Sequence, residues 1–310
     1  MATNTTVEVP KNEDSGRGFM FALSAYLLWG FLPLYMKAVA HISPAEVISH
    51  RVLWSVPVAG IILILLRRTG DLKIALRSPR MLAMAALTAA LISINWGIYV
   101  WAIGAGRALD TALGYFINPL FSIMLGSLLL KEKLLKTQIA AIVLAAIAVA
   151  ILAFETGSLP WVALSLTVTW GFYAFFRKTL PIGPNQGFLL EVLLLAPFAL
   201  GYLIYLAITG QGHFLASDRT DTLLLMASGL VTAVPLILYA NGAKLLRLST
   251  IGIMQYIAPT MIFLVAVFIF HEPFGTARAI AFPLIWAALV VYSWPLLTAY
   301  RKRPPTTPPL

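Results

Sequence analysis

Four ionisable side chains lie inside apolar stretches, where a charge is costly unless it faces a protein interior or a wet pathway. Glu46, His50 and Arg51 occur together in "SPAEVISHRVLWS", and Glu191 lies in "GFLLEVLLLAPF". Glu46 and His50 are four residues apart and share one helical face. Carboxylates and imidazoles can exchange protons, so Glu46, His50 and Glu191 are candidates for proton coupling. Arg51 and Glu191 are also candidates for contacting a solute.

A second group consists of polar and aromatic residues at helical spacing. Thr111, Tyr115 and Asn118 step by four and three, which places them on one face of a helix. Such stripes can instead hold helices together through hydrogen bonds, each contributing about 0.6 kcal/mol. We expect the group to line a pathway and bind solute. With Arg51 and Glu191, its members are Trp29, Asn95, Tyr99, Thr111, Tyr115, Asn118, Tyr239, Gln255 and Tyr256.

Membrane-spanning helices must position these residues. The chain has 310 residues, of which 60% are hydrophobic and 11% charged, whereas about 25% are charged in a soluble domain. Its apolar runs are continuous instead of alternating, and many reach the roughly 20 residues that cross a bilayer as a helix. We predict an all-α integral membrane protein with ten transmembrane helices, at 18–37, 46–66, 81–103, 110–130, 137–154, 159–176, 187–208, 222–242, 249–270 and 277–298.

The basic residues indicate how these helices are oriented. If the N-terminus is cytoplasmic, 17 of the 22 Lys and Arg residues fall in cytoplasmic segments, and Lys37, Arg107, Arg219 and Arg278 fall outside. Positive charge favours the cytoplasmic side of a membrane, so both termini are predicted to be cytoplasmic. The net charge of +10 is spread over these loops. It therefore does not indicate a nucleic-acid-binding face.

Several other classes of site are not expected. There is no cysteine, and the four histidines are scattered without metal-ligand spacing. No glycine-rich loop with an adjacent lysine is present, so we expect no ATP-driven chemistry in this chain. We predict no metal and no cofactor. An integral-membrane enzyme acting on lipid-linked substrates is the alternative function.

The two halves of the sequence are related by a nearly fixed offset of 140 residues. Pro119 and Glu132, thirteen residues apart, recur as Pro259 and Glu272, and "WGF" at 29–31 recurs at 170–172. Five spans per copy would make the second copy enter the membrane from the opposite side, as in inverted-repeat transporters. The predicted units are a tail 1–17, repeat 18–155, repeat 156–298 and a basic tail 299–310.

Arg51 and Glu191 are equivalent positions under this offset. Each lies about six residues inside its own membrane face, or about 9 Å at the helical rise. The two faces are opposite, so we expect the side chains to occupy different halves of one pathway instead of pairing directly. Glu46 lies near the interface, so the alternative there is a simply solvated carboxylate. His50 and Arg51 lie deeper, so a function or a structural ion pair is favoured over random exposure for these two.

Several longer motifs resemble a known family. "AYLLWGFLPLYMK", "EVISHRVLWS", "INWGIYVWA", "LGYFINPL", "GSLPWVALSLTVTWGFYAFFRK" and "RLSTIGIMQYIAPTMIFLVAV" resemble the RarD family of bacterial permeases, in the EamA branch of the drug/metabolite transporter superfamily. The resemblance extends over about residues 18–298. It implies two EamA repeats, ten helices, a bacterial inner-membrane location and transport of a small metabolite or drug.

The expected function is therefore secondary transport by alternating access, with export as the favoured direction. Arg51 and the aromatic residues around it suit an anionic or zwitterionic aromatic solute, through charge pairing and stacking. The other expected partner is the lipid bilayer, with no nucleic acid and no ATP. The sequence does not indicate which solute moves, which ion drives it, or the oligomeric state.

Overall fold

The computed structural model contains helices, turns and loops but no strands in the part of the chain that it describes, which comprises residues 15–65, 69–130, 134–179, 181–216, 218–243, 245–246, 250 and 254–301. The all-α prediction is confirmed for these residues. Glu132 and most of the two predicted tails lie outside them. The helices are, in chain order, α1 (Gly16–Ala38), α2 (Pro44–Leu65), α3 (Gly70–Leu76), α4 (Pro79–Gly104), α5 (Ala108–Leu130), α6 (Lys136–Thr156), α7 (Trp161–Thr179), α8 (Pro184–Thr209), α9 (Arg219–Ala243), α11 (Ile257–Leu264), the π-helix η1 (Val265–Ile269) and α12 (Thr276–Arg301).

Eight of these helices are long and apolar enough to cross a membrane: α1, α2, α4, α5, α6, α8, α9 and α12. Helix α7 occupies the sixth predicted span, with 19 residues. The short helix α3 was not predicted. The protein is therefore a multi-pass membrane protein.

The continuous ninth helix predicted over 249–270 is wrong in detail. Gln255 and Tyr256 form a turn, α11 begins at Ile257, and the last five residues before Phe270 are π-helical. Pro259 explains the start of α11, because a proline ring clashes with the carbonyl four residues earlier, here that of Gln255. In the first turn of a helix the same proline is tolerated.

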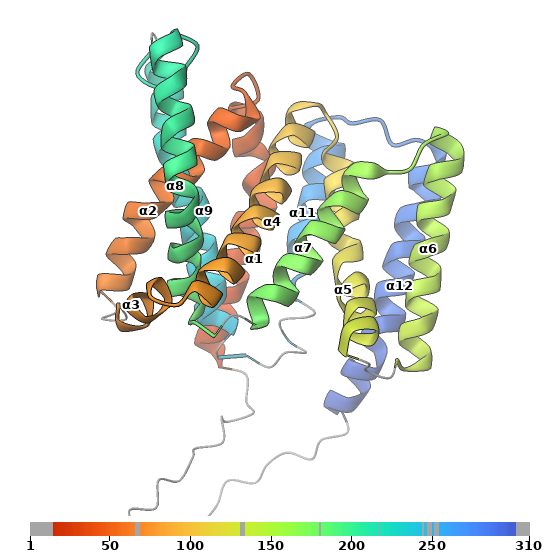
Figure 1. Cartoon of the computed structure of the whole chain (residues 1–310). Coiled ribbons are helices and arrows are strands. Elements are labelled where there is room, and N and C mark those ends of the chain that lie inside the picture. Colours follow the sequence, from red (N-terminus) through yellow and green to blue (C-terminus); the bar gives the residue numbers. More distant parts are fainter. Residues whose placement is uncertain are drawn as a thin grey trace, which may run out of the picture.

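The long helices alternate in direction along the chain (Figure 1). We call the lower face the side where α1 begins and α12 ends, and the upper face the opposite side. The turns that follow α1, α4, α6 and α8 lie at the upper face. Local caps fix some helix ends. At the lower face, Ser78 Oγ accepts a hydrogen bond from Met81 N at the start of α4, and at the upper face Gly157 and Gly210 end α6 and α8 with positive φ.

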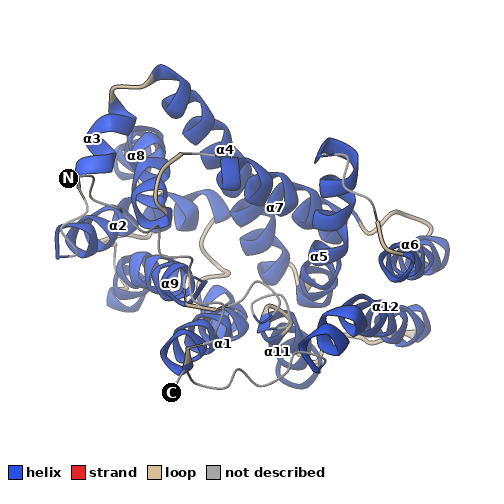
Figure 2. Ribbon diagram, turned by 90° about the horizontal axis from the view of Figure 1, so that it is seen from below, coloured by secondary structure: helices blue, strands red, loops and turns tan. Residues whose placement is uncertain are grey.

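The helices pack in pairs that join the two halves of the sequence. Helix α1 packs against α9 and α11, α2 against α8 and α9, α4 against α7 and α8, α5 against α7 and α11, and α6 against α12. Seen from below, α6 and α12 form one edge of the bundle, and α2, α3 and α8 lie at the other (Figure 2). The space between these edges is where the candidate site lies.

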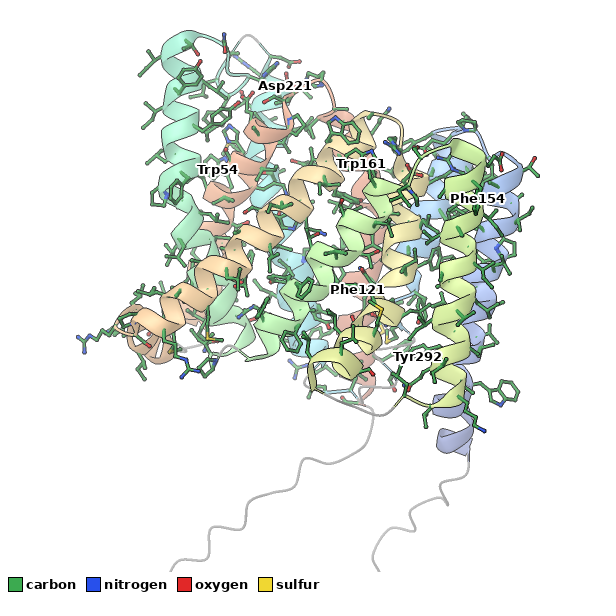
Figure 3. All side chains as sticks on the ribbon, turned by 45° about the vertical axis from the view of Figure 1, so that its right-hand side comes forward. Trp54, Phe121, Phe154, Trp161, Asp221 and Tyr292 are labelled. Atoms are coloured by element: carbon green, nitrogen blue, oxygen red, sulfur yellow. The ribbon has the colours of Figure 1, made fainter. Side chains whose placement is uncertain are left out.

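The bundle is apolar on its outside and closely packed at several crossings. Phe154, on the outer side of α6 (Figure 3), is 88% exposed, and Ile208 is 80% exposed. Such large apolar surfaces suit contact with lipid. At the α2–α9 crossing a Cβ on Gly229 would lie 2.3 Å from the backbone of Trp54. Small residues of this kind let membrane helices approach closely.

Candidate functional site

A cavity of about 160 Å³ lies between the two halves of the bundle. A cavity of about 150 Å³ is large enough to hold a benzene molecule, so this one suits a single small ring. Its wall comes from α1, α2, α4, α5, α7, α9 and α11, with Gln255 in the turn before α11. The lining residues are Tyr26, Trp29, Leu32, Arg51, Ile92, Asn95, Trp96, Tyr99, Tyr115, Asn118, Trp170, Tyr173, Thr232, Leu236, Tyr239, Gln255, Ala258, Pro259 and Ile262.

The structure brings most of the predicted solute-binding residues together around this cavity. Thr111, Glu191 and Tyr256 do not line it. Thr111 is fully buried and donates to the carbonyl of Ala108, and Tyr256 packs against the apolar core. The eight that do line it are Trp29, Arg51, Asn95, Tyr99, Tyr115, Asn118, Tyr239 and Gln255.

Arg51 is the one formally charged residue among the described residues of the cavity wall. Arg51 is only 3% exposed. Its Nε donates to Thr232 Oγ1 at 3.0 Å, and its guanidinium carbon lies 4.6 Å from the centre of the Trp96 ring. Nη1 has no hydrogen-bond partner among the described residues. The charge is thus partly stabilised by a hydroxyl and an aromatic face.

Aromatic rings make up much of the remaining wall. At the α1–α9 contact, the ring centres of Tyr26, Trp29 and Tyr239 lie 5.5–5.9 Å from one another. On the opposite side, Tyr99 and Tyr115 are 5.9 Å apart. These distances are typical of edge-to-face and tilted aromatic pairs. A flat solute in the cavity would therefore meet rings from both halves of the chain.

Polar atoms are few in this wall and partly unsatisfied. Asn95 donates to the carbonyl of Leu166 at 3.1 Å and to Thr169 Oγ1 at 2.9 Å, which fixes its orientation. Tyr99 Oη and Asn118 Oδ1 are buried without a partner among the described residues. Buried polar atoms are normally paired, so these two atoms have unused hydrogen-bonding capacity beside the cavity.

Glu191 lies beside the cavity wall, within a polar cluster of its own. It is 1% exposed and accepts hydrogen bonds from Thr88 Oγ1 at 2.8 Å and from Tyr173, a cavity residue, at 3.3 Å. Arg177 Nε lies 3.3 Å from its Oε1. Arg51 and Glu191 therefore have separate partners, as their depths predicted. Arg51 lies in the cavity wall, whereas Glu191 lies beside it.

Contacts at the upper face join the two halves of the chain. Glu46 Oε1 accepts from the backbone N–H of His213 at 2.7 Å, and Glu46 Oε2 lies 2.9 Å from His213 Nδ1. Asp221, labelled at the upper face in Figure 3, lies 2.9 Å from Nε2 of His41. The alternative of a solvated Glu46 is wrong, because Glu46 is 1% exposed. Neither His50 nor Arg51 forms an ion pair with a carboxylate of the described residues. His50 Nδ1 accepts from Trp54 Nε1 at 3.3 Å.

A second group of upper-face contacts surrounds the start of α5. Glu272 accepts from the backbone N–H groups of Ala108 at 2.6 Å and Leu109 at 2.9 Å. Asp110 faces Arg107 at 2.8 Å and Arg278 at 3.1 Å. Burial raises the pKa of Glu272, and the two backbone donors and Arg278 oppose that rise. We refer to the contacts of Glu46, Asp221, Glu272 and Asp110 as the upper-face polar contacts.

Some residues of the site were not predicted. Thr232 and Tyr173 were missed because their partners, Arg51 and Glu191, lie on other helices. Trp170 could have been found, because it occupies the position of Trp29 in the second "WGF". Among the described residues, no three His, Asp or Glu side chains gather closely enough to hold a metal ion.

Comparisons with known proteins identify the family. A family model described as "EamA-like transporter family" matches residues 16–154. An "Uncharacterized transporter" from Vibrio cholerae is 40% identical over 92% of this chain and 94% of its own length. A "Protein RarD" from Streptomyces exfoliatus is also 40% identical, over 94% of each chain, and that of Escherichia coli is 36% identical, over 94% of this chain and 98% of its own. The chain belongs to the RarD family of EamA transporters.

A solved crystal structure of a protein supports the fold independently. It superposes with a TM-score of 0.58 at 19% identity, over 92% of this chain and 99% of that one. At that identity the likeness concerns the fold alone. Membership of the RarD family makes the chain a membrane transporter and not an enzyme, and the cavity is the natural place to look for its solute.

Proposed function

We propose that this RarD-family chain is a secondary transporter that moves one small solute through the central cavity by alternating access. The proposal rests on one observation: residues at equivalent positions in the two halves of the chain line the cavity together. The equivalent pairs, 140 or 141 residues apart, are Trp29 and Trp170, Leu32 and Tyr173, Ile92 and Thr232, Trp96 and Leu236, Tyr99 and Tyr239, Tyr115 and Gln255, and Asn118 and Ala258.

The proposed architecture is ten spans in two inverted five-helix repeats, 18–155 and 156–298. The ninth span would be α11 with η1 and the preceding turn, and the sixth α7. In the proposed repeat, α1 corresponds to α7, α4 to α9 and α5 to α11. The contact between α1 and α9 therefore corresponds to that between α7 and α4, and the contact between α5 and α7 to that between α11 and α1; all four are observed. Tyr99 lies near the upper end of α4 and Tyr239 near the lower end of α9. Inversion of one repeat relative to the other accounts for this exchange of faces.

The lower face is proposed to be cytoplasmic, with the protein in the bacterial inner membrane. Most of the described basic residues outside the spans lie at that face, whereas Lys37, Arg107, Arg219 and Arg278 belong to upper-face segments. This distribution follows the positive-inside rule. Both chain ends are then cytoplasmic.

The conformation observed fits the cytoplasm-facing half of such a cycle. The upper-face polar contacts join the two halves above the cavity. The cavity wall extends from Tyr99, five residues from the upper end of α4, to Tyr239, four residues from the lower end of α9. A solute entering from below would meet Tyr26, Trp29 and Tyr239 first. In an export cycle this is the conformation that loads solute from the cytoplasm, and export is the proposed direction.

Within the cavity, each group has a separate role. The aromatic rings stack on a flat solute and exclude water from it. Arg51 supplies a positive charge, which suits an anionic or zwitterionic aromatic solute. Glu46, His50 and Glu191 are the proposed sites of proton coupling, and each is buried. Glu191 is connected to the cavity through Tyr173.

Flux into proteoliposomes tests the proposal. Purified protein is reconstituted, and uptake of a panel of radiolabelled aromatic metabolites is followed with and without a pH gradient. Native protein should accelerate uptake of at least one of them, and Trp29→Ala together with Trp170→Ala should reduce that uptake. Equal uptake by protein-free liposomes for the whole panel would contradict transport.

A further inference from the structure

We infer that the solute is an aromatic monocarboxylate without a free amino group, bound with its carboxylate at Arg51. The inference rests on the proposed function, because it assigns the ligand class of the same cavity. It selects one of the two charge types that the sequence allowed, the anion over the zwitterion.

The charge of Arg51 is the first step. A buried cation is costly unless a counter-ion or several hydrogen bonds compensate it. No carboxylate of the described residues lies within ion-pair distance of Arg51; its partners are the Thr232 hydroxyl and the Trp96 ring. Nη1 remains unpartnered among the described residues. A solute anion would supply the missing counter-charge.

The second step concerns what the wall lacks for an ammonium group. Among the described lining residues there is no Asp or Glu. The nearest carboxylate in the hydrogen-bond network, that of Glu191, already faces Arg177 and accepts from Thr88 and Tyr173. An ammonium in the cavity would thus lose its hydration without an available carboxylate, close to a fixed positive charge.

The third step is the distribution of neutral groups. Tyr99 Oη is buried without a partner among the described residues and can donate to a carboxylate oxygen. The rings of Tyr26, Trp29 and Tyr239, on α1 and α9, form one aromatic part of the wall. One charged end and several ring faces, in a volume of about 160 Å³, match one ring with one carboxylate.

Four probes of nearly equal size separate the charge types: phenylacetate, phenethyl alcohol, phenethylamine and phenylalanine. Binding to the purified full-length protein is measured by calorimetry at neutral pH. We expect phenylacetate to bind roughly tenfold more tightly than the alcohol, a ratio that one modest ionic interaction provides. The amine and the amino acid should bind more weakly than the acid. Equal or tighter binding of either one, or no binding of phenylacetate, would overturn the inference.

Two variants test the assignment to Arg51. Arg51→Gln should make the acid and the alcohol bind about equally, whereas a merely structural arginine would weaken both probes alike and preserve their ratio. Arg51→Lys should retain part of the preference for the acid. Arg219→Gln, which removes a positive charge at the start of α9, is the matched control and should leave the ratio unchanged. If Arg51→Gln does not fold, the preferences of native protein and of Arg51→Lys still decide the question.

Flux measurements with the same probes keep the two proposals apart. If phenylacetate binds with the expected preference but is not transported, the ligand class stands and the proposed function fails. If phenethylamine or phenylalanine is transported in place of phenylacetate, the transporter proposal stands and the monocarboxylate inference is wrong.

Discussion

The carboxylate of Glu46 binds His213 twice, through the backbone N–H at 2.7 Å and through the ring nitrogen Nδ1 at 2.9 Å. Glu46 is in the first turn of α2, and His213 is in the segment between α8 and α9. The pair therefore ties the first half of the chain to the second at the upper face. Replacing this carboxylate with the amide of glutamine would keep one acceptor oxygen and turn the other into an NH2 donor, so the side chain could no longer accept from both the backbone N–H and a protonated Nδ1.

Glu46→Gln should open the upper face more often. The chain contains no cysteine, so Leu236→Cys places a single thiol in the cavity wall. A membrane-impermeant maleimide should label this thiol faster from the cytoplasmic side than from outside. Adding Glu46→Gln should raise the outside rate several-fold.

Asp218→Asn provides the matched control for that experiment. Asp218 also precedes α9, but its carboxylate accepts from the nearby Thr220 N–H and does not join the two halves. Its outside labelling rate should equal that of the parent. Faster labelling from outside in the parent, or no effect of Glu46→Gln, would contradict closure by the upper-face polar contacts.

Replacement of Tyr239 by alanine should impair transport, whereas replacement of Tyr256 should lower thermal stability. Tyr239 lines the cavity and contacts the rings of Tyr26 and Trp29, so Tyr239→Ala should raise the KM of transport by roughly three- to tenfold, as expected for loss of one aromatic contact. Tyr256 packs against the core and is absent from the wall. Tyr256→Ala should lower the Tm in detergent and leave flux per folded molecule unchanged. A KM effect confined to Tyr256→Ala would reverse this assignment.

The sequence predicts those parts of the fold that depend on local signals. Long apolar stretches indicate their own helices, and the offset of 140 residues relates positions such as Tyr99 and Tyr239, both in the cavity wall. The prediction is poorer where the outcome depends on a distant partner. The turn at Gln255 follows from Pro259 locally, but the π-helix at Val265–Ile269 has no evident local cause.

The same distinction applies to the candidate site. Spacing places Tyr115 and Thr111 on related faces of α5, but only tertiary packing decides that Tyr115 lines the cavity and that Thr111 bonds its own helix. Arg177 follows an apolar stretch, so the sequence predicts only that it is a charge at the cytoplasmic end of its helix. Its contact with Glu191 depends on how α7 and α8 are placed relative to each other, which the spacing of residues within either helix does not indicate.

Glu191→Gln tests proton coupling. The amide keeps the size of the side chain and one acceptor oxygen, so it can accept from one of the hydroxyls of Thr88 and Tyr173 and donate to the other, but it cannot titrate. If Glu191 carries protons, flux driven by a pH gradient should be abolished, while exchange of solute across the membrane persists. Gradient-driven flux at the native rate would exclude this role. Arg177→Gln separates loss of the ion pair from loss of the proton site, because it breaks the pair and retains the carboxylate.

Glu272 should make stability depend on pH. Burial raises its pKa in the folded protein, so the folded state retains a proton at pH values where the unfolded chain has lost it. The contribution of Glu272 to the free energy of unfolding is therefore largest at acid pH. This contribution falls as the pH rises from the ordinary glutamate range through the raised pKa. The Tm of native protein minus that of Glu272→Gln should decrease over this window. Arg278, which opposes the shift, and Asp110, which favours it, are kept in both proteins; a difference that grows with pH would contradict the argument.

Gly229→Ala should destabilise the contact between the two halves at the α2–α9 crossing. A Cβ there would lie 2.3 Å from the carbonyl carbon and oxygen of Trp54, and a backbone cannot give way as a flexible side chain can. Overpacking of this kind costs about 1–3 kcal/mol, so the Tm should fall by several degrees. Gly201→Ala is the matched control, because a Cβ at that exposed position of α8 meets nothing within 4 Å. Alanine lowers the entropy lost on forming a helix, so Gly201→Ala should leave the Tm unchanged or raise it slightly. An equal response of the two variants would show that α2 and α9 are not packed as closely as the structure places them.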